Sequence, residues 1–353
     1  MVPPGYIIRP VSSGDLAGLF ALCLQAGPGF TSLQAEETYL RALIACSEAS
    51  FASPEGSPKG TYFLVMEHCE TGDVVGCASV KTGVGSDAFM CADFEMNGPS
   101  ERPDALTLRR TLQGFTEVGS LFLHPAHRAS GAGRYLARAR YMLMATRPDL
   151  FDKPIVSQLR GWCDEAECSP FYDAIWSPRL GQTYEESDAR LARDGAGFIL
   201  SEFDGLHVPL DTLDEKALHA IGRPHDTAAG ALRLLVQEGF HPSSLIDMSD
   251  GGPIVLSTLG ELNSARTARQ VSLMDGHPEP GAQMTLLASS SLQDFRAYVG
   301  CVSIDAQDRV TCHASAISQL NAGQDTRFLI STPPPSNPGK EPHAHTNWSL
   351  DNV

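Results

Sequence analysis

The sequence predicts a mixed α/β fold, in which a sheet is combined with helices. Short apolar runs typical of strands alternate along the chain with apolar residues at helical spacing. Residues 121–148 place an apolar strand, a basic glycine loop and a helix end to end. Of the 353 residues, 42% are hydrophobic and 19% are charged, which is ordinary for a globular protein and sufficient to bury a core.

Most of the predicted elements lie in the first two thirds of the chain. Strands are expected from period-two runs or short apolar runs that end at turns, and helices from a capping residue followed by apolar residues three and four apart. In order, we expect a strand at 6–9, a helix after the cap at 13–15, a helix at 35–46, strands at 62–66 and 74–80 around a turn at 70–73, loop at 97–110, a strand at 118–123, a helix at 133–145, a strand at 155–159, a short helix from Ser169 and a strand at 198–200.

The pattern restarts on a smaller scale after residue 205. Helices are expected at 213–221 and 227–237, followed by a strand at 245–248. From 265 to 331, short apolar runs such as 295–302 and 310–314 suggest a small β-rich module. Residues 332–353 are rich in proline and poor in apolar residues, which is typical of a disordered tail. The predicted domains are therefore 1–205, 206–331 and the tail at 332–353.

The segment at 121–148 contains no acidic residue, although roughly three would be expected from the chain's average. It carries five arginines and the loop Arg128-x-x-Gly131-x-Gly133. Glycines let the backbone approach a ligand closely, and the first amides of a helix lack intrahelical partners, so this loop predicts a phosphate site. On spacing alone, a simple turn or helix start remains the alternative. The loop lacks the third glycine of a dinucleotide-binding fingerprint and the Gly-Lys-Ser/Thr of a P-loop.

The loop resembles the acyl-CoA loop of the Gcn5-related N-acetyltransferase superfamily, R/Q-x-x-G-x-G/A after a strand. The matching residues are Leu121, Leu123, Pro125, Arg128, Gly131 and Gly133. The resemblance implies that backbone amides of the loop hold the pyrophosphate of coenzyme A. The cofactor-binding set that it implies is Leu121, Leu123, Arg128, Gly131, Ala132, Gly133 and Arg134.

Motifs over most of residues 5–331 resemble the bacterial arginine N-succinyltransferase family. They are Ile7-Ile8-Arg9-Pro10-Val11, Thr31-Ser32-Leu33, Glu117-Val118-x-x-Leu121-Phe122-Leu123, Arg160-Gly161, Asp164-Glu165, Ser169-Pro170-Phe171, Ile221-Gly222-x-x-His225, Glu238-Gly239-Phe240 and Ile246-Asp247-x-x-Asp250-Gly251-Gly252-Pro253. The resemblance implies an acyl-CoA N-acyltransferase-like domain followed by a smaller related α/β unit. It also implies an enzyme of arginine catabolism that moves succinyl from succinyl-CoA to the α-amine of L-arginine or a relative such as ornithine.

Three residues outside the loop are candidates for the chemistry. The resemblance gives His225 the role of proton donor; the alternative is a helix cap. Glu117 is a candidate base acting through water, and the alternative is a solvated strand end. Arg160 could pair with a substrate carboxylate, or form an internal salt bridge to Asp164 or Asp173. The resemblance also gives Leu121 a backbone contact to the pantetheine arm.

Composition bounds the partners and the compartment. A net charge of −16 argues against nucleic acid, no apolar segment is long enough to predict a membrane span, and nine scattered cysteines favour a reducing cytoplasm. We expect no metal and no permanently bound cofactor, because succinyl-CoA is a co-substrate. The protein is expected to be a homodimer or a heteromer with a paralogous subunit, if it is not monomeric.

Three departures from the family pattern put the amine substrate in doubt more than the fold or the acyl donor. They are Gln158-Leu159, Arg179-Leu180 and His207-Val208-Pro209. Two alternatives therefore stay open. The protein is an N-acyltransferase for another pair of acyl-CoA and amine, or it is a non-catalytic acyl-CoA-binding partner of a paralogous succinyltransferase.

Overall fold

The computed structural model describes residues 5–26, 33–86, 89–98, 103–151, 153–321 and 327–331. These residues form two compact units, the first from 5–82, 117–153 and 258–331 and the second from 83–116 and 154–257. Each unit contains segments from before and from after residue 205. The division into domains at 1–205 and 206–331 stays a prediction about which segments fold on their own. The tail at 332–353 and the motif residues Thr31 and Ser32 lie outside the described residues.

The first unit contains a sheet of antiparallel neighbours in the order β13-β1-β2-β3-β6. Its strands are β1 Tyr6–Pro10, β2 Thr61–His68, β3 Val74–Lys81, β6 Thr116–Leu123 and β13 Ala297–Ile304. Helices α1 Leu16–Ala26, which follows the 3-10 turn η1 Ser13–Asp15, and α2 Glu37–Ala52 pack on β2 and β3 through Phe63, Val65 and Cys77.

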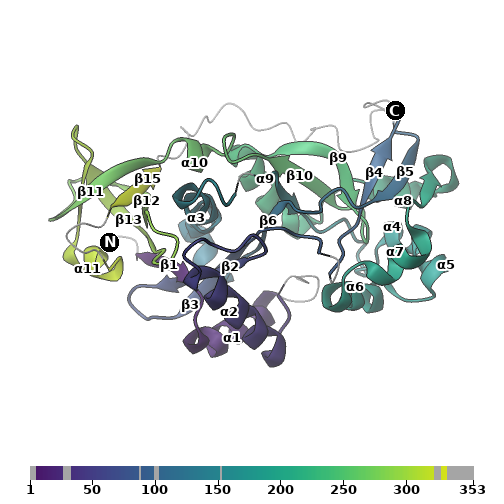
Figure 1. The fold of residues 1–353 in the computed structure, drawn as a ribbon, viewed down its shortest axis with the longest axis horizontal. Helices are drawn as coiled ribbons and strands as arrows, with labels where there is room; N and C mark the ends of the chain where they lie inside the picture. The colour runs from purple at the N-terminus through teal and green to yellow at the C-terminus, as the bar shows by residue number, and fades with distance from the viewer. Residues whose placement is uncertain are drawn as a thin grey trace. The chain divides into compact units, whose positions relative to one another are not determined.

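Helix α3 Ala132–Thr146 also packs on β3 (Figure 1). A Cβ atom at Gly76 of β3 would come within 2.9 Å of Leu136, so the absence of a side chain lets the helix approach the strand closely. Residues 124–131 connect the end of β6 at Leu123 to the start of α3 at Ala132.

A five-stranded barrel forms the end of the first unit. Strand β13 belongs both to the sheet and to this barrel. The other barrel strands are β11 Arg269–Asp275, β12 Gln283–Ser289, β14 Arg309–Cys312 and β15 Phe328–Ser331. The ring closes as β13-β12-β15-β11-β14-β13, in which β11 and β14 are parallel and the other pairs are antiparallel. Val271, Leu287, Phe328 and Ile330 fill its core together with α11 Ala314–Gln319. The short helix α10 Asn263–Arg266 precedes the barrel. The barrel itself confirms the expected β-rich module.

The second unit contains an antiparallel run of strands in the order β10-β9-β4-β5-β8, with β7 paired to β10. Its strands are β4 Asp93–Asn97, β5 Ala105–Arg109, β7 Ile155–Gln158, β8 His207–Pro209, β9 His241–Asp247 and β10 Pro253–Ser257. Its helices are α4 Pro170–Ile175, α5 Ser177–Leu180, α6 Tyr184–Asp194, α7 Gly197–Phe203, α8 Glu215–Ala220 and α9 Ala229–Glu238. The core joins Phe94, Leu106 and Ile246 of the strands to Phe171 and Trp176 of the helical layer.

Two local predictions were wrong. Residues 97–110, expected to be loop, contain the end of β4 and all of β5, because Leu106 and Leu108 are buried against the helices of the second unit. Residues 198–200, expected to be a strand, lie in α7. A three-residue apolar run cannot distinguish a strand from a buried helix by periodicity. The mixed α/β class itself is confirmed. No helix in the described ranges is long and apolar enough to cross a membrane.

Candidate active site

The strand that leads into the glycine loop is irregular at its centre. Ser120 of β6 has a φ of +49°, and the pairing of β6 with β3 shifts register between Cys77 and Ser79. A non-glycine residue in the left-handed region within a strand marks a bulge, which turns the backbone groups beside it away from the ladder. Here the bulge falls one residue before Leu121, whose side chain is half-buried. Leu123, two residues later, is buried in the core.

The loop from His124 to Gly133 makes a tight turn into α3. Residues Pro125–Ser130 form the 3-10 turn η2, and Gly131, with a φ of +72°, connects it to the helix. Gly131 is therefore required by backbone conformation. Gly133 is not, because a Cβ there would meet only Leu123 Cδ2 at 3.6 Å, an ordinary contact. At the helix start, the amide of Ala132 donates to Ser130 Oγ at 3.2 Å.

Arg128 and Arg134 are exposed on either side of this turn. The Nε atom of Arg128 donates to the Leu123 carbonyl at 3.0 Å, and Arg134 stacks on Tyr135 with 4.8 Å from Cζ to the ring centroid. Within the described part of the chain, neither forms an ion pair with a carboxylate. Their charges are thus held near the start of α3 without local compensation, which suits an anionic ligand.

The other arginines of the acid-free segment have structural roles. Arg138 and Arg140 are 6% and 2% exposed. Arg138 donates to Ser264 and Ser331, whereas Arg140 donates to the carbonyl oxygens of Ala137 and Gly119. Arg147, at the end of α3, forms a salt bridge with Asp149. Three of the five arginines of this segment thus make contacts within the protein, and Arg128 and Arg134 remain the candidates for an anionic ligand.

Glu117 lies at the start of β6, opposite Lys81 of β3. Its Oε2 atom is 3.7 Å from Lys81 Nζ, and its side chain is 20% exposed. It belongs to the same unit as the glycine loop.

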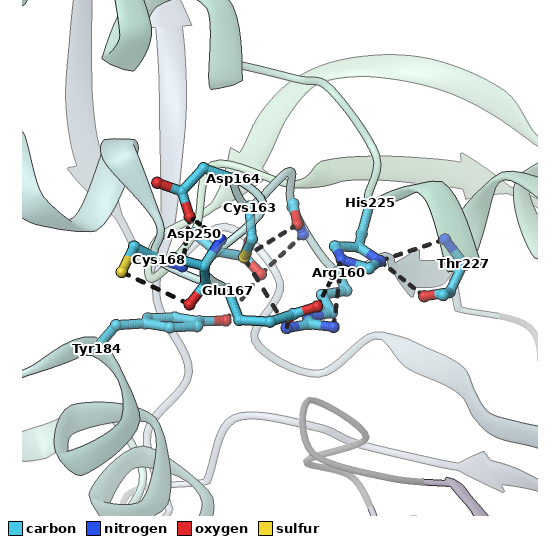
Figure 2. A network of polar contacts seen from close by, with 11 residues as sticks. Arg160, Cys163, Asp164, Glu167, Cys168, Tyr184, His225, Thr227 and Asp250 are labelled. Carbon is cyan, nitrogen blue, oxygen red and sulfur yellow. Dashed lines mark hydrogen bonds and ion pairs between the residues drawn. The ribbon is translucent and has the colours of Figure 1, made fainter.

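His225 and Arg160 lie in the second unit and are brought together by backbone pairing. Gly161 and Pro224 form an antiparallel bridge, the amide of His225 donates to the Arg160 carbonyl at 2.8 Å, and the amide of Trp162 donates to the Arg223 carbonyl at 3.0 Å. Two residues that are 65 positions apart thus share one site (Figure 2).

One ring nitrogen of His225 is occupied. The amide of Thr227 donates to His225 Nδ1 at 3.2 Å, and Thr227 Oγ1 lies 2.7 Å from the same nitrogen. His225 therefore caps the turn η4 Asp226–Ala228, as the alternative interpretation held. A backbone amide can only donate, so Nδ1 accepts and the neutral ring carries its proton on Nε2. Burial, followed by the charge of Arg160, lowers the pKa of His225 below its usual value.

The Nε2 side of His225 faces an ion pair. Arg160 Nη2 donates to Glu167 Oε2 at 2.6 Å, Arg160 Nη1 lies 3.5 Å from His225 Nε2, and Glu167 Oε1 lies 3.8 Å from the same nitrogen. The internal salt bridge considered for Arg160 exists, but its partner is Glu167 rather than Asp164 or Asp173. Glu167 was missed because only the fold of the turn at 164–168 directs its side chain toward Arg160.

A buried carboxylate, that of Asp250, binds the backbone of the segment that carries Arg160. Asp250, 4% exposed, accepts from the amides of Gly161 and Gly252 at 2.8 and 2.9 Å and from the Tyr184 hydroxyl at 3.3 Å (Figure 2). A Cβ at Gly161 would overlap Asp250, so these segments pass each other backbone to backbone. Burial, followed by the charge of Asp247, raises the pKa of Asp250.

Asp188 is a further acid in this region that the sequence did not single out. Burial and the charge of Asp247 raise its pKa to about 7. Asp188 lies in α6, whereas Asp247 and Asp250 lie close together about 60 positions further along the chain, so only the fold brings the three carboxylates into one region. Within the described ranges, no three His, Cys, Asp or Glu side chains are grouped so as to hold a metal ion.

Comparisons with known proteins agree with one another. The family model described as "Arginine N-succinyltransferase beta subunit" matches residues 6–264. Arginine N-succinyltransferase of Salmonella paratyphi B is 32% identical over 339 residues, which cover 92% of this chain and 97% of that protein. The enzyme of the same name from Enterobacter sp. (strain 638) is 29% identical over 338 residues, covering 93% of this chain and 98% of the relative.

A solved structure shows the same fold. The arginine/ornithine succinyltransferase subunit AI from Pseudomonas aeruginosa superposes with a TM-score of 0.82 at 24% identity, covering 94% of this chain and 99% of that one.

Proposed function

Since this chain belongs to the arginine N-succinyltransferase family, we propose that it transfers the succinyl group of succinyl-CoA to the α-amine of L-arginine in arginine catabolism. The observation that carries the proposal is the family match over residues 6–264, supported by a histidine whose Nε2 is held beside an arginine. Ornithine is the nearest alternative amine.

The glycine loop of the first unit is the proposed binding site for the acyl donor. The pyrophosphate would bind beside the amides of Gly131, Ala132 and Gly133, where it would compete with the Arg128 carbonyl for the Gly131 amide and with Ser130 Oγ for the Ala132 amide. Arg128 and Arg134 would add positive charge. Leu121 and Leu123 would line the path of the pantetheine arm, with the Leu121 backbone as its hydrogen-bonding partner. The support is the bulge at Ser120 and the absence of an ion pair to either arginine among the described residues.

The reaction needs orientation and proton transfer rather than a protein nucleophile. The neutral amine attacks the thioester carbonyl, a carbon–nitrogen bond forms, and the carbon–sulfur bond breaks. We assign to His225 the transfer of the Nε2 proton to the departing sulfur. The proton that the attacking nitrogen loses restores the ring through solvent. Glu117 is the proposed base for that proton, acting through a water molecule, and Arg160 is the proposed partner of a substrate carboxylate.

Turnover by the purified protein tests the proposal. Incubation with succinyl-CoA and L-arginine should release free coenzyme A thiol and yield N-succinylarginine by mass spectrometry. The His225→Ala variant should lower kcat by about 100-fold or more, with little change in acyl-CoA binding, since general acid–base groups contribute on that order. A variant with full kcat between pH 6 and 9 would make His225 a structural cap alone.

Two outcomes would favour the alternatives. Thiol release with a different acyl-CoA or amine, but not with this pair, would keep the acyltransferase and change its substrates. Binding of acyl-CoA without turnover, together with gain of activity on mixing with a paralogous succinyltransferase, would identify a non-catalytic partner subunit. The same mixing experiment, followed by light scattering, distinguishes a homodimer from a heteromer.

A further inference from the structure

A single carboxylate pairs with Arg160 and lies close to the ring of His225. The two oxygens of Glu167 are divided between them, with Oε2 2.6 Å from Arg160 Nη2 and Oε1 3.8 Å from His225 Nε2. Figure 2 shows the guanidinium of Arg160 beside the ring of His225, with the end of the Glu167 side chain reaching toward both. A carboxylate bound as a ligand would pair with the same guanidinium.

The three side chains differ in exposure. Those of Arg160 and His225 are 18% and 11% exposed, whereas that of Glu167 is 57% exposed. The donors therefore belong to the body of the unit, and the carboxylate reaches them from the solvent side. Within the part of the chain that the structure describes, Glu167 is the one carboxylate in ion-pair contact with Arg160.

The turn that carries Glu167 is anchored at its ends. Asp164 Oδ1 accepts from the amides of Ala166 and Cys168, and the Cys168 carbonyl accepts from the Asp164 amide. Glu167 has a φ of +60°, a left-handed conformation that costs free energy in a residue with a side chain. Because none of these hydrogen bonds involves the Glu167 side chain, that side chain can leave Arg160 by rotation about its own bonds without breaking the turn.

We propose that Arg160, beside the ring of His225, forms a carboxylate-binding subsite, and that Glu167 occupies this subsite until a carboxylate of the substrate displaces it. The proposal rests on the proposed function, because that reaction brings two such groups: the α-carboxylate of the amino acid and the terminal carboxylate of the succinyl chain. Either would meet a guanidinium that can bind it through two donors, which leaves the Nε2 proton of His225 for the departing sulfur.

Kinetics of the Glu167→Gln variant test this displacement. Glutamine keeps the shape of the side chain and removes the competing charge, so the KM of the substrate whose carboxylate enters the subsite should fall about two- to fivefold. Glu165→Gln is the matched control, because it removes one charge from an exposed position of the same turn, and its KM values should equal those of the unmodified protein.

Substrates without a carboxylate identify which group enters the subsite. Agmatine lacks the α-carboxylate of arginine, and acetyl-CoA lacks the terminal carboxylate of succinyl-CoA. The KM of L-arginine should fall while that of agmatine does not, or the KM of succinyl-CoA should fall while that of acetyl-CoA does not. Unchanged or increased KM values for both carboxylate substrates would overturn the proposal. A tenfold fall in kcat at constant KM would also overturn it, by making Glu167 a partner of His225 in proton transfer.

Calorimetry with succinate as a probe separates this inference from the proposed reaction. Binding should be tighter for Glu167→Gln than for the unmodified protein or for Glu165→Gln, and the gain should vanish in the Glu167→Gln, Arg160→Leu double variant. Tighter binding in a protein without transferase activity would support the subsite and reject the proposed function. Equal affinity in an active enzyme would reject the subsite alone.

Discussion

His225 has one ring nitrogen available for chemistry. Thr227 occupies Nδ1, and Nε2 faces Arg160 and Glu167. The neighbouring charges have opposite effects on the pKa of the ring, because burial and Arg160 lower it whereas Glu167 and Asp226 raise it. Since the lowering effects are larger, the neutral ring is the form present at pH 7.5.

An NMR titration of His225 checks this balance. The midpoint should lie below the usual value of 6.5, should rise in Arg160→Leu and should fall further in Glu167→Gln. A folded-state pKa below the unfolded value means that the contribution of this residue to stability is present above pH 6.5 and is lost as the pH falls below it. A midpoint at or above 6.5 in the unmodified protein would contradict the order of these effects.

A substitution at Gly133 separates the role of the loop in ligand binding from its role in the fold. The protein itself tolerates a Cβ there, and alanine in place of glycine within a helix adds about 0.5–1 kcal/mol of stability. Gly133→Ala should therefore keep or raise Tm while lowering the affinity for CoA about tenfold, because the methyl group would occupy space that the pyrophosphate needs. Differential scanning and isothermal calorimetry measure the two effects.

Gly230→Ala in α9 is the matched control, because a Cβ at Gly230 would meet nothing within 4 Å. It should change Tm similarly and leave CoA affinity unaltered. If Gly133→Ala binds CoA normally, the loop is only a helix start. Gly131→Val is less informative, because its positive φ strains any side chain irrespective of ligand.

At the level of elements, the site depends on three segments that cross at Gly161, Pro224 and Gly252. Asp250 joins two of them through the amides of Gly161 and Gly252, and the Gly161–Pro224 bridge adds the third. His225 is fixed on the bridge by its hydrogen bond to the Arg160 carbonyl. We therefore expect Asp250, which does not touch the histidine, to help position it.

Asp250→Asn tests this indirect positioning. Asparagine offers one acceptor oxygen, so one of the two buried amides should lose its partner, at a cost of about 1–3 kcal/mol in the free energy of unfolding. We expect a lower Tm and a fall in kcat of about tenfold at nearly constant KM for succinyl-CoA. A variant that loses stability but keeps kcat would show that Asp250 supports the fold alone.

Asp247→Asn is the control for this substitution. One oxygen of Asp247, Oδ1, accepts from Ser249 and Asp250, and asparagine retains one such oxygen.

The pH dependence of the free energy of unfolding gives a second readout for Asp250. Because the pKa of Asp250 is raised above 3.8 in the folded state, its contribution to stability declines as the pH rises from about 4 toward neutrality, and Asp250→Asn should lack this decline.

For the whole molecule, the preference for the acyl donor is the property that distinguishes a succinyltransferase from a general acyltransferase. A site built to pair the terminal carboxylate would leave its donors unsatisfied with acetyl-CoA. We expect kcat/KM for succinyl-CoA to exceed that for acetyl-CoA by at least about tenfold, or about 1.4 kcal/mol. Competition assays with L-arginine measure this ratio, and equal use of the two donors would leave only the broader N-acyltransferase assignment.

The sequence by itself determined the features that depend on neighbouring residues. The strand, turn and helix from Thr116 to Thr146, the cap at Ser169 and the strand pair around the turn at 70–73 were all predictable, because periodicity and turn chemistry act over a few positions. The ordered motifs likewise identified the family, which the comparisons confirmed.

Tertiary structure decided the features that depend on distant segments. Arg138 is one of the five arginines of the acid-free segment, but it donates to Ser264 and Ser331, which are more than 120 positions away. Three further features also depend on segments that are distant in the sequence. They are the approach of Glu167 to His225, the parallel pairing of β11 with β14 and the burial of β5. Burial and partner choice depend on which surfaces the folded chain brings together, and a local pattern of residues does not contain that information.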